Sequence, residues 1–179
     1  MLSKPEYGWT HFQLGNETEY RLSYLTDVAF EWLTQAIHGL ETMDVFSVHG
    51  FSEPGRMVCT VSYWSCYIIF EDDGPAPTCD RVQHVHVNMI DFCKNLYQDI
   101  LNNLNDWVHW DDDGLECSVD NPLDDPLDDD VDDAEVDKLI AAGMKDAIRN
   151  REKMLRDKLE ELNKLIDEKE EYFDNGCFF

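Results

Sequence analysis

Two histidines two residues apart, His84 and His86, are the pair whose type and spacing best suit a metal site. Side chains two apart on a β-strand lie on the same face, and imidazole is a common zinc ligand. Cys79 or Cys93 could supply a third ligand, so a metal-dependent enzyme is one hypothesis. The competing interpretation is two half-buried strand residues beside Val82. Because a zinc site needs three or four converging ligands, we expect no bound metal and no cofactor.

Other catalytic chemistry has little support in the sequence. The chain contains no GxSxG, no phosphate-binding glycine loop and no HExxH. An EF-hand loop needs Gly at its sixth place and Glu at its twelfth, which no register of 106–137 provides. Three cysteines fall at expected core positions, where cysteine behaves as a small hydrophobe: Cys59, Cys66 and Cys93. We therefore predict that the protein is not an enzyme.

The charge of the chain is strongly lopsided. Its 179 residues hold 39 acids and 14 bases, for a net charge of −25. Residues 1–110 carry 15 acids and 5 bases, residues 111–137 carry 14 acids and no base, and residues 138–179 carry 10 acids and 9 bases. Such a chain would be repelled by nucleic acid and by anionic membrane surfaces. We expect direct binding to neither.

The acidic middle segment is the strongest functional signal. One interpretation is a solvated segment that aids solubility. The sharper hypothesis is a decoy whose carboxylates imitate nucleic-acid phosphates and fill a basic cleft of another protein, with salt-sensitive association. The predicted partner-binding residues are eight aspartates: Asp111, Asp112, Asp113, Asp124, Asp125, Asp128, Asp129 and Asp130.

Residues 1–110 have the pattern of an α+β domain. Apolar alternation in 9–14 and 19–24 around Gly15-Asn16 predicts a hairpin. A helix is expected next, capped by Thr26 and ending near Gly39.

More strands and a second helix follow. We expect a strand over 43–48, one long or two shorter strands over 57–70, and a strand over 81–87. A second helix is expected from its Asn88 cap to about Val108. This order favours an antiparallel sheet of about five to six strands with helices on one face.

The remainder divides into an acidic linker, 111–132, and a long helix, 133–179. The linker repeats Pro-Leu-Asp-Asp at 122–125 and 126–129, where proline opposes helix and aspartates repel one another. The long helix has a narrow apolar stripe, so it needs the α+β domain, a partner or a second copy for support. A homodimer through this helix, or a self-assembling scaffold, is an open alternative.

The pattern of residues 7–110 resembles small bacterial α+β proteins that look like immunity proteins of toxin systems. The resemblance lies in the run from Trp9 to Gly15, the run from Tyr20 to Asp27, the helix through Trp32-Leu33 to Leu40, the strands at 57–70 and 81–87, and the helix after Asn88. It implies a binding protein that blocks a partner, and it assigns a role to no individual residue.

Together these features predict a non-enzymatic acidic inhibitor that blocks a basic or nucleic-acid-binding surface of a partner, as an immunity protein blocks a toxin nuclease. A phage-type nucleic-acid mimic that disables a host defence nuclease, such as an anti-CRISPR protein, is the alternative in the same class. The first residues lack the apolar core of a signal peptide, and the six cysteines show no CxxC pair. We therefore expect free thiols and a cytoplasmic location.

Overall fold

A computed structural model of the chain describes residues 1–72, 78–79, 82–110 and 133–174. This part of the chain is α+β, as predicted. Its elements, in chain order, are β1 (Trp9–Phe12), β2 (Tyr20–Ser23), α1 (Val28–Thr42), β3 (Phe46–Phe51), β4 (Arg56–Val61), β5 (Cys66–Asp72), β6 (Thr78–Cys79), β7 (Gln83–Val85), α2 (Met89–Asn102), α3 (Leu104–Val108) and α4 (Asp133–Asp174).

The strands form two antiparallel sheets. The main sheet has the order β3-β4-β5, and both β6 and β7 pair with β5. The β1-β2 hairpin is a separate sheet stacked on the main one. Gly50 of β3 makes this stacking possible, because a Cβ there would lie 2.9 Å from Leu22 Cδ1 of β2. Tyr20 of β2 also stacks on Phe70 of β5, with ring centroids 5.7 Å apart.

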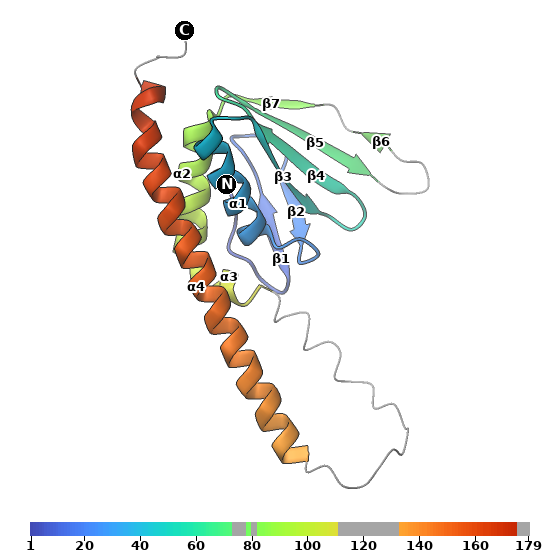
Figure 1. The fold of residues 1–179 in the computed structure, drawn as a ribbon. Helices are drawn as coiled ribbons and strands as arrows, with labels where there is room; N and C mark the ends of the chain where they lie inside the picture. The colour runs from blue at the N-terminus through green and yellow to red at the C-terminus, as the bar shows by residue number, and fades with distance from the viewer. Residues whose placement is uncertain (73–77, 80–81, 111–132, 175–179) are drawn as a thin grey trace.

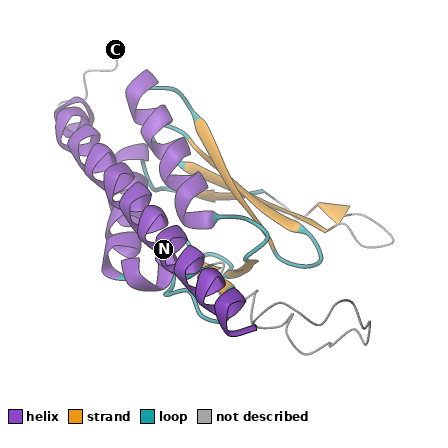
Figure 2. Ribbon diagram, turned by 60° about the horizontal axis from the view of Figure 1, so that its bottom comes forward, coloured by secondary structure: helices purple, strands orange, loops and turns teal. Residues whose placement is uncertain are grey.

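The helices gather on one side of the main sheet, in two layers (Figures 1 and 2). The α1 helix packs on β3, where the Trp32 indole Nε1 donates a 2.7 Å hydrogen bond to the His49 carbonyl oxygen. The α4 helix packs in turn on α1 and α2. Buried side chains of the sheet, α1, α2 and α4 form one continuous core. In the described residues, no helix is long and apolar enough to cross a membrane.

The bounds of the first helix differ from prediction at both ends. Asp27, not Thr26, is the N-cap, because its carboxylate accepts a hydrogen bond from the Phe30 backbone N–H. The helix continues past Gly39 to Thr42. Gly39 serves packing instead of termination, since a Cβ there would overlap the ring of Phe46.

The second predicted helix also differs. Its Asn88 cap is confirmed, with the side chain accepting a 2.8 Å hydrogen bond from the Asp91 backbone N–H. The helix ends at Asn102, however, and the short α3 follows. The 57–70 stretch is two strands, β4 and β5, joined by a turn in which the Ser62 N–H donates to the Ser65 carbonyl.

The long helix obtains its support from the α+β layer. Among the α4 side chains that the structure describes, from residue 142 on, the buried ones are Leu155, Leu159, Leu162, Ile166 and Phe173. Residues 142–147 are exposed, and Figure 1 shows the first half of the helix extending beyond the other helices. The continuous core joins 133–174 to the preceding domain. The division into 1–110, 111–132 and 133–179 stays a prediction.

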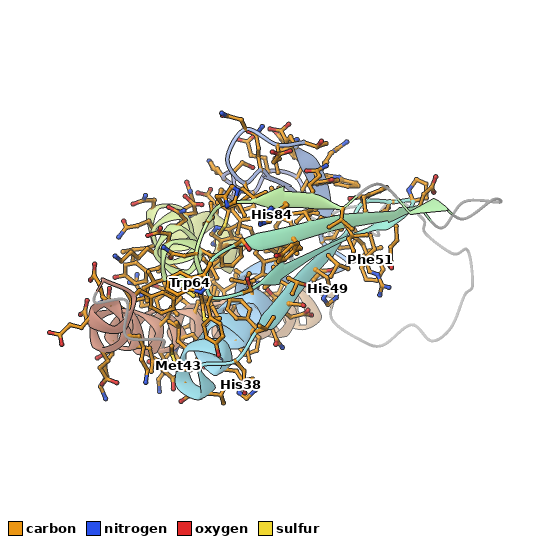
Figure 3. The ribbon with its side chains drawn as sticks, turned by 90° about the horizontal axis from the view of Figure 1, so that it is seen from above. His38, Met43, His49, Phe51, Trp64 and His84 are labelled. Atoms are coloured by element: carbon orange, nitrogen blue, oxygen red, sulfur yellow. The ribbon has the colours of Figure 1, made fainter. Side chains whose placement is uncertain are left out.

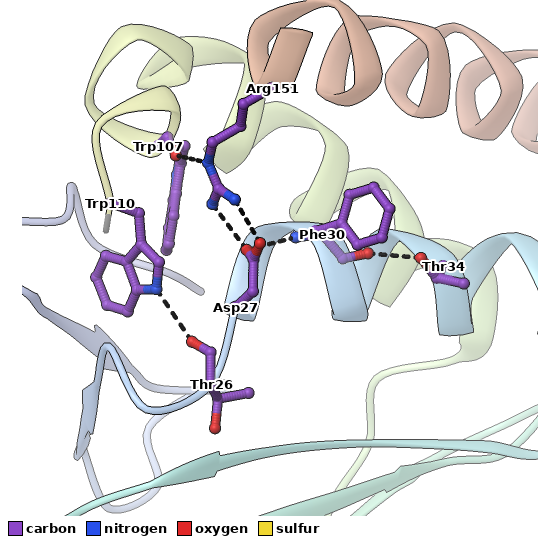
Figure 4. Close-up of polar contacts among 7 residues, drawn as sticks. All are labelled: Thr26, Asp27, Phe30, Thr34, Trp107, Trp110 and Arg151. Carbon is purple, nitrogen blue, oxygen red and sulfur yellow. Dashed lines mark hydrogen bonds and ion pairs between the residues drawn. The ribbon is translucent and has the colours of Figure 1, made fainter. Parts of the chain in front are cut away.

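One ion pair and its neighbouring hydrogen bond join three helices near the middle of α4 (Figure 4). The Arg151 guanidinium donates hydrogen bonds to both carboxylate oxygens of Asp27, and the Nη2–Oδ1 distance is 2.8 Å. Its Nε donates to the Trp107 carbonyl at the end of α3. Arg151 and Asp27 are 19% and 26% exposed, so water screens the pair only weakly.

We expect replacement of Arg151 by Met to lower the free energy of unfolding by about 2–4 kcal/mol, since it leaves a partly buried carboxylate without its cation. The control is Arg156→Met, which removes an exposed pair with Glu152 in the same helix. That change should cost less than about 1 kcal/mol. Urea denaturation followed by circular dichroism measures the free energy of unfolding of both variants. Equal decreases would contradict the claim that the Arg151–Asp27 pair stabilises the fold more than an exposed pair does.

Candidate protein-binding surface

The aspartates proposed from the sequence as the contact lie outside the described residues. They are Asp111, Asp112, Asp113, Asp124, Asp125, Asp128, Asp129 and Asp130. Their role in binding a basic partner stays a prediction.

The histidine pair lies together on the surface of the main sheet. The rings of His84 and His86 meet edge to face with centroids 4.5 Å apart, and His84 stacks on Tyr67 of the neighbouring strand at 4.9 Å. Both histidines are exposed, not half-buried. Cys93 is fully buried in α2, and the side chain of Cys79 lies outside the described residues.

The described residues bring no third ligand to this pair. Among them, no group of three or more His, Cys, Asp or Glu side chains is placed to hold a metal ion. The metal-dependent enzyme therefore gains no support from the described geometry.

Three buried thiols occupy the core, as predicted. A hydrogen bond with Cys66, together with burial, raises the pKa of the Cys59 thiol well above its ordinary value. Burial likewise raises the pKa of the Cys93 thiol, with a smaller contribution from Cys66. The Cys66 thiol donates to the Val87 carbonyl oxygen at 3.3 Å. Because the thiolate is the reactive form, the raised pKa values of Cys59 and Cys93 disfavour a nucleophilic role, and Cys66 is buried away from solvent.

Among the described residues, the surface best suited to bind a protein is the face of the main sheet that points away from the helices. Alternation along the strands sends Val48, Met57, Cys59 and Ile68 inward, where all are buried. Their neighbours point outward in three rows across the strands. We define the outer face by these rows, which are Ser47, Thr60, Tyr67 and His84, then His49, Val58 and Ile69, then Phe51, Arg56 and Glu71.

Aromatic and imidazole rings mark both edges of the outer face (Figure 3). His49 and Phe51 lie along β3, with ring centroids 6.2 Å apart. His84 lies on β7 and covers Tyr67, which is 41% exposed. Trp64, in the turn at one end of the sheet, is 50% exposed and meets Phe173 of α4 edge to face. Exposed aromatic side chains of this kind are enriched at protein interfaces.

The charges on the outer face cancel locally. Arg56 donates from Nε and Nη2 to Glu71 Oε2, at 2.9 and 2.5 Å. The neighbouring acid Glu31 of α1 lies with its Oε2 3.9 Å from His49 Nε2. Further acids stand at the strand ends, with Asp44 before β3 and Glu53 in the β3–β4 turn. Acids therefore lie near both ends of β3, and the described part of the outer face has no unpaired Lys or Arg.

The period-two pattern of 46–51 and 66–71 was the signal that could have revealed this surface. Our sequence analysis predicted strands over 43–48 and 57–70 but assigned neither face of these strands to the core or to solvent. Comparison with protein-family models, curated proteins and solved structures finds no match to the chain. The resemblance to immunity proteins accordingly stays a prediction.

Raised thiol pKa values predict slow alkylation of the core cysteines. At pH 8 the native protein should incorporate iodoacetamide at Cys59, Cys66 and Cys93 at least about tenfold more slowly than the protein unfolded in guanidinium. Raising the pH to 9 should change native labelling of Cys59 and Cys93 little, because their raised pKa keeps these two thiols protonated. Peptide mass spectrometry reads each site separately. Fast native labelling of Cys93 would contradict the buried arrangement.

Proposed function

We propose that the protein is a non-enzymatic binding protein whose outer face docks on a basic surface of a partner protein. The observation that carries this proposal is the arrangement of the outer face: rings along β3 and along β5 and β7, apolar Val58 and Ile69 between them, and no unpaired Lys or Arg among its described residues. Interfaces commonly have a charge-depleted aromatic core and a polar rim. Tyr67, Phe51 and His84 would form the core of the contact.

The charge of the surroundings indicates the sign of the partner. The described residues of 1–110 carry 13 acids and four bases, net −9, so the acidity belongs to the folded body as well as to the segment after it. A basic partner would be attracted over a distance before the outer face makes contact. An immunity protein that blocks a toxin nuclease is the specific form we propose, since the substrate cleft of a nuclease is basic.

The acidic segment after Trp110 would add to this attraction. Charges on a flanking segment change the rate of association and its salt dependence more than the lifetime of the complex. The outer face would therefore determine the dissociation rate of the complex, and the aspartates would determine its association rate. This division of roles can be tested separately for each part.

The test of the outer face begins with capture of the tagged protein's partner from lysate of its native host, eluted by a salt gradient. The purified partner is then titrated against Tyr67→Ala and Tyr24→Ala. These tyrosines are similarly exposed, at 41% and 45%, but Tyr24 lies beyond β2, away from the outer face. We expect Tyr67→Ala to bind about tenfold more weakly or worse, and Tyr24→Ala to bind as wild type.

The captured partner must also satisfy the chemistry of the proposal. It should be basic, and its action on nucleic acid should stop at one equivalent of added protein. A neutral or acidic partner, or unchanged affinity of Tyr67→Ala, would contradict the proposal.

Neutralising five aspartates tests the steering role. Changing Asp124, Asp125, Asp128, Asp129 and Asp130 to Asn should slow association with that partner and flatten its dependence on salt, because fewer charges attract it. The dissociation rate should change little. Stopped-flow kinetics at several salt concentrations separates the two rates. An unchanged salt slope would show that this segment only aids solubility.

A further inference from the structure

The β1-β2 hairpin carries a cavity, separate from the outer face, whose wall includes two basic side chains, Lys4 and Arg21. The cavity has a volume of about 520 Å³, and its walls include Lys4, Tyr7, Trp9, His11 and Arg21. His11 and Arg21 are directly opposite each other on β1 and β2. Glu6 is the one carboxylate among the described residues that line it. In a chain of net charge −25, this local excess of cationic groups is unexpected.

Arg21 is the centre of the cavity. Of the four Lys and Arg in the described part of 1–110, three form ion pairs: Lys4 with Asp106, Arg56 with Glu71 and Lys94 with Glu170. Within the described residues, Arg21 forms none. Its guanidinium carbon lies over the Trp9 ring, 3.9 Å from the centroid, and this contact limits the motion of the side chain. A guanidinium oriented in this way offers two parallel N–H groups to an oxyanion.

An aromatic ring stands at the same cavity. Tyr7 and Gly8 both have positive φ, 51° and 71°, in the two-residue turn between Glu6 and Trp9. This backbone is sparsely populated for tyrosine, and it holds the ring 85% exposed. The ring is free to stack on a planar group of a ligand.

We propose that this cavity binds a small phosphate monoester that carries an aromatic ring, of the nucleoside monophosphate class. The phosphate would accept charged hydrogen bonds from Arg21, and the base would stack on Tyr7. Carboxylates more than about 8 Å away repel the phosphate only weakly, because this is the screening length at 0.15 M salt. This site goes beyond the proposed function and does not depend on it.

Isothermal titration with AMP, adenosine and inorganic phosphate at 0.15 M salt tests the proposal on the full chain. Wild-type protein should bind one AMP, and both adenosine and phosphate more weakly. Arg21→Met should weaken AMP binding about tenfold or more, because the charged hydrogen bonds are lost. Arg56→Met, which removes an arginine already paired with Glu71, is the matched control and should bind as wild type.

Arg21 and Tyr7 are both exposed, so Arg21→Met and Tyr7→Ala should fold, which their melting temperatures will verify. Tyr7→Ala should reduce binding of AMP but leave that of phosphate unchanged. The proposal is overturned by absent or non-saturable AMP binding, by equal binding to Arg21→Met, or by phosphate binding as tightly as AMP.

Discussion

The arrangement of the helices depends on two interactions made by the carboxylate of Asp27. It caps α1 by accepting from the Phe30 N–H and at the same time pairs with Arg151 of α4. One residue earlier, the carbonyl of Thr26 accepts from the indole Nε1 of Trp110, which brings the chain after α3 back to the start of α1. The N-terminus of α1, the end of α3 and the middle of α4 are therefore held at one place.

This constraint explains why the two faces of the main sheet differ. The apolar stripe of α4 is partly buried at Ile148 and fully buried from Leu155 on, so the ion pair of Arg151 lies where the long helix joins the body. Once joined, α4 covers α1 and α2, and these helices cover the inner side of the sheet. In the described structure the helices pack only on that side. The outer face is left available for a partner.

Local signals predicted much of the fold. The hairpin, the Asn88 cap and the span of α4 follow from turn residues, capping chemistry and helix propensity, all of which act within a few residues. Predictions failed where contacts between residues far apart in the chain determine the structure. Gly39 looked like a helix end, but it makes room for Phe46. The stacking of β2 over Gly50, which makes the hairpin a second sheet, has no local signature.

The candidate surface was less predictable than the fold. Sequence reasoning followed net charge to the aspartates of 111–130, because charge is visible in composition. The outer face depends on register, which places Tyr67 beside His84 only when β5 pairs with β7. That Arg21 forms no ion pair within the described residues depends on where the nearby carboxylates lie. Both features arise from contacts between residues far apart in the chain.

The most direct test of the account is side-chain footprinting of the protein, free and bound to its captured partner. Hydroxyl-radical labelling with mass spectrometry reports exposure of single residues. We predict strong protection of Tyr67, Phe51 and His84 in the complex, with unchanged labelling of Tyr24 and Met154, which lie on other surfaces. Protection of Met154 on α4, with the outer face still labelled, would contradict the claim that the open side of the sheet is the docking surface.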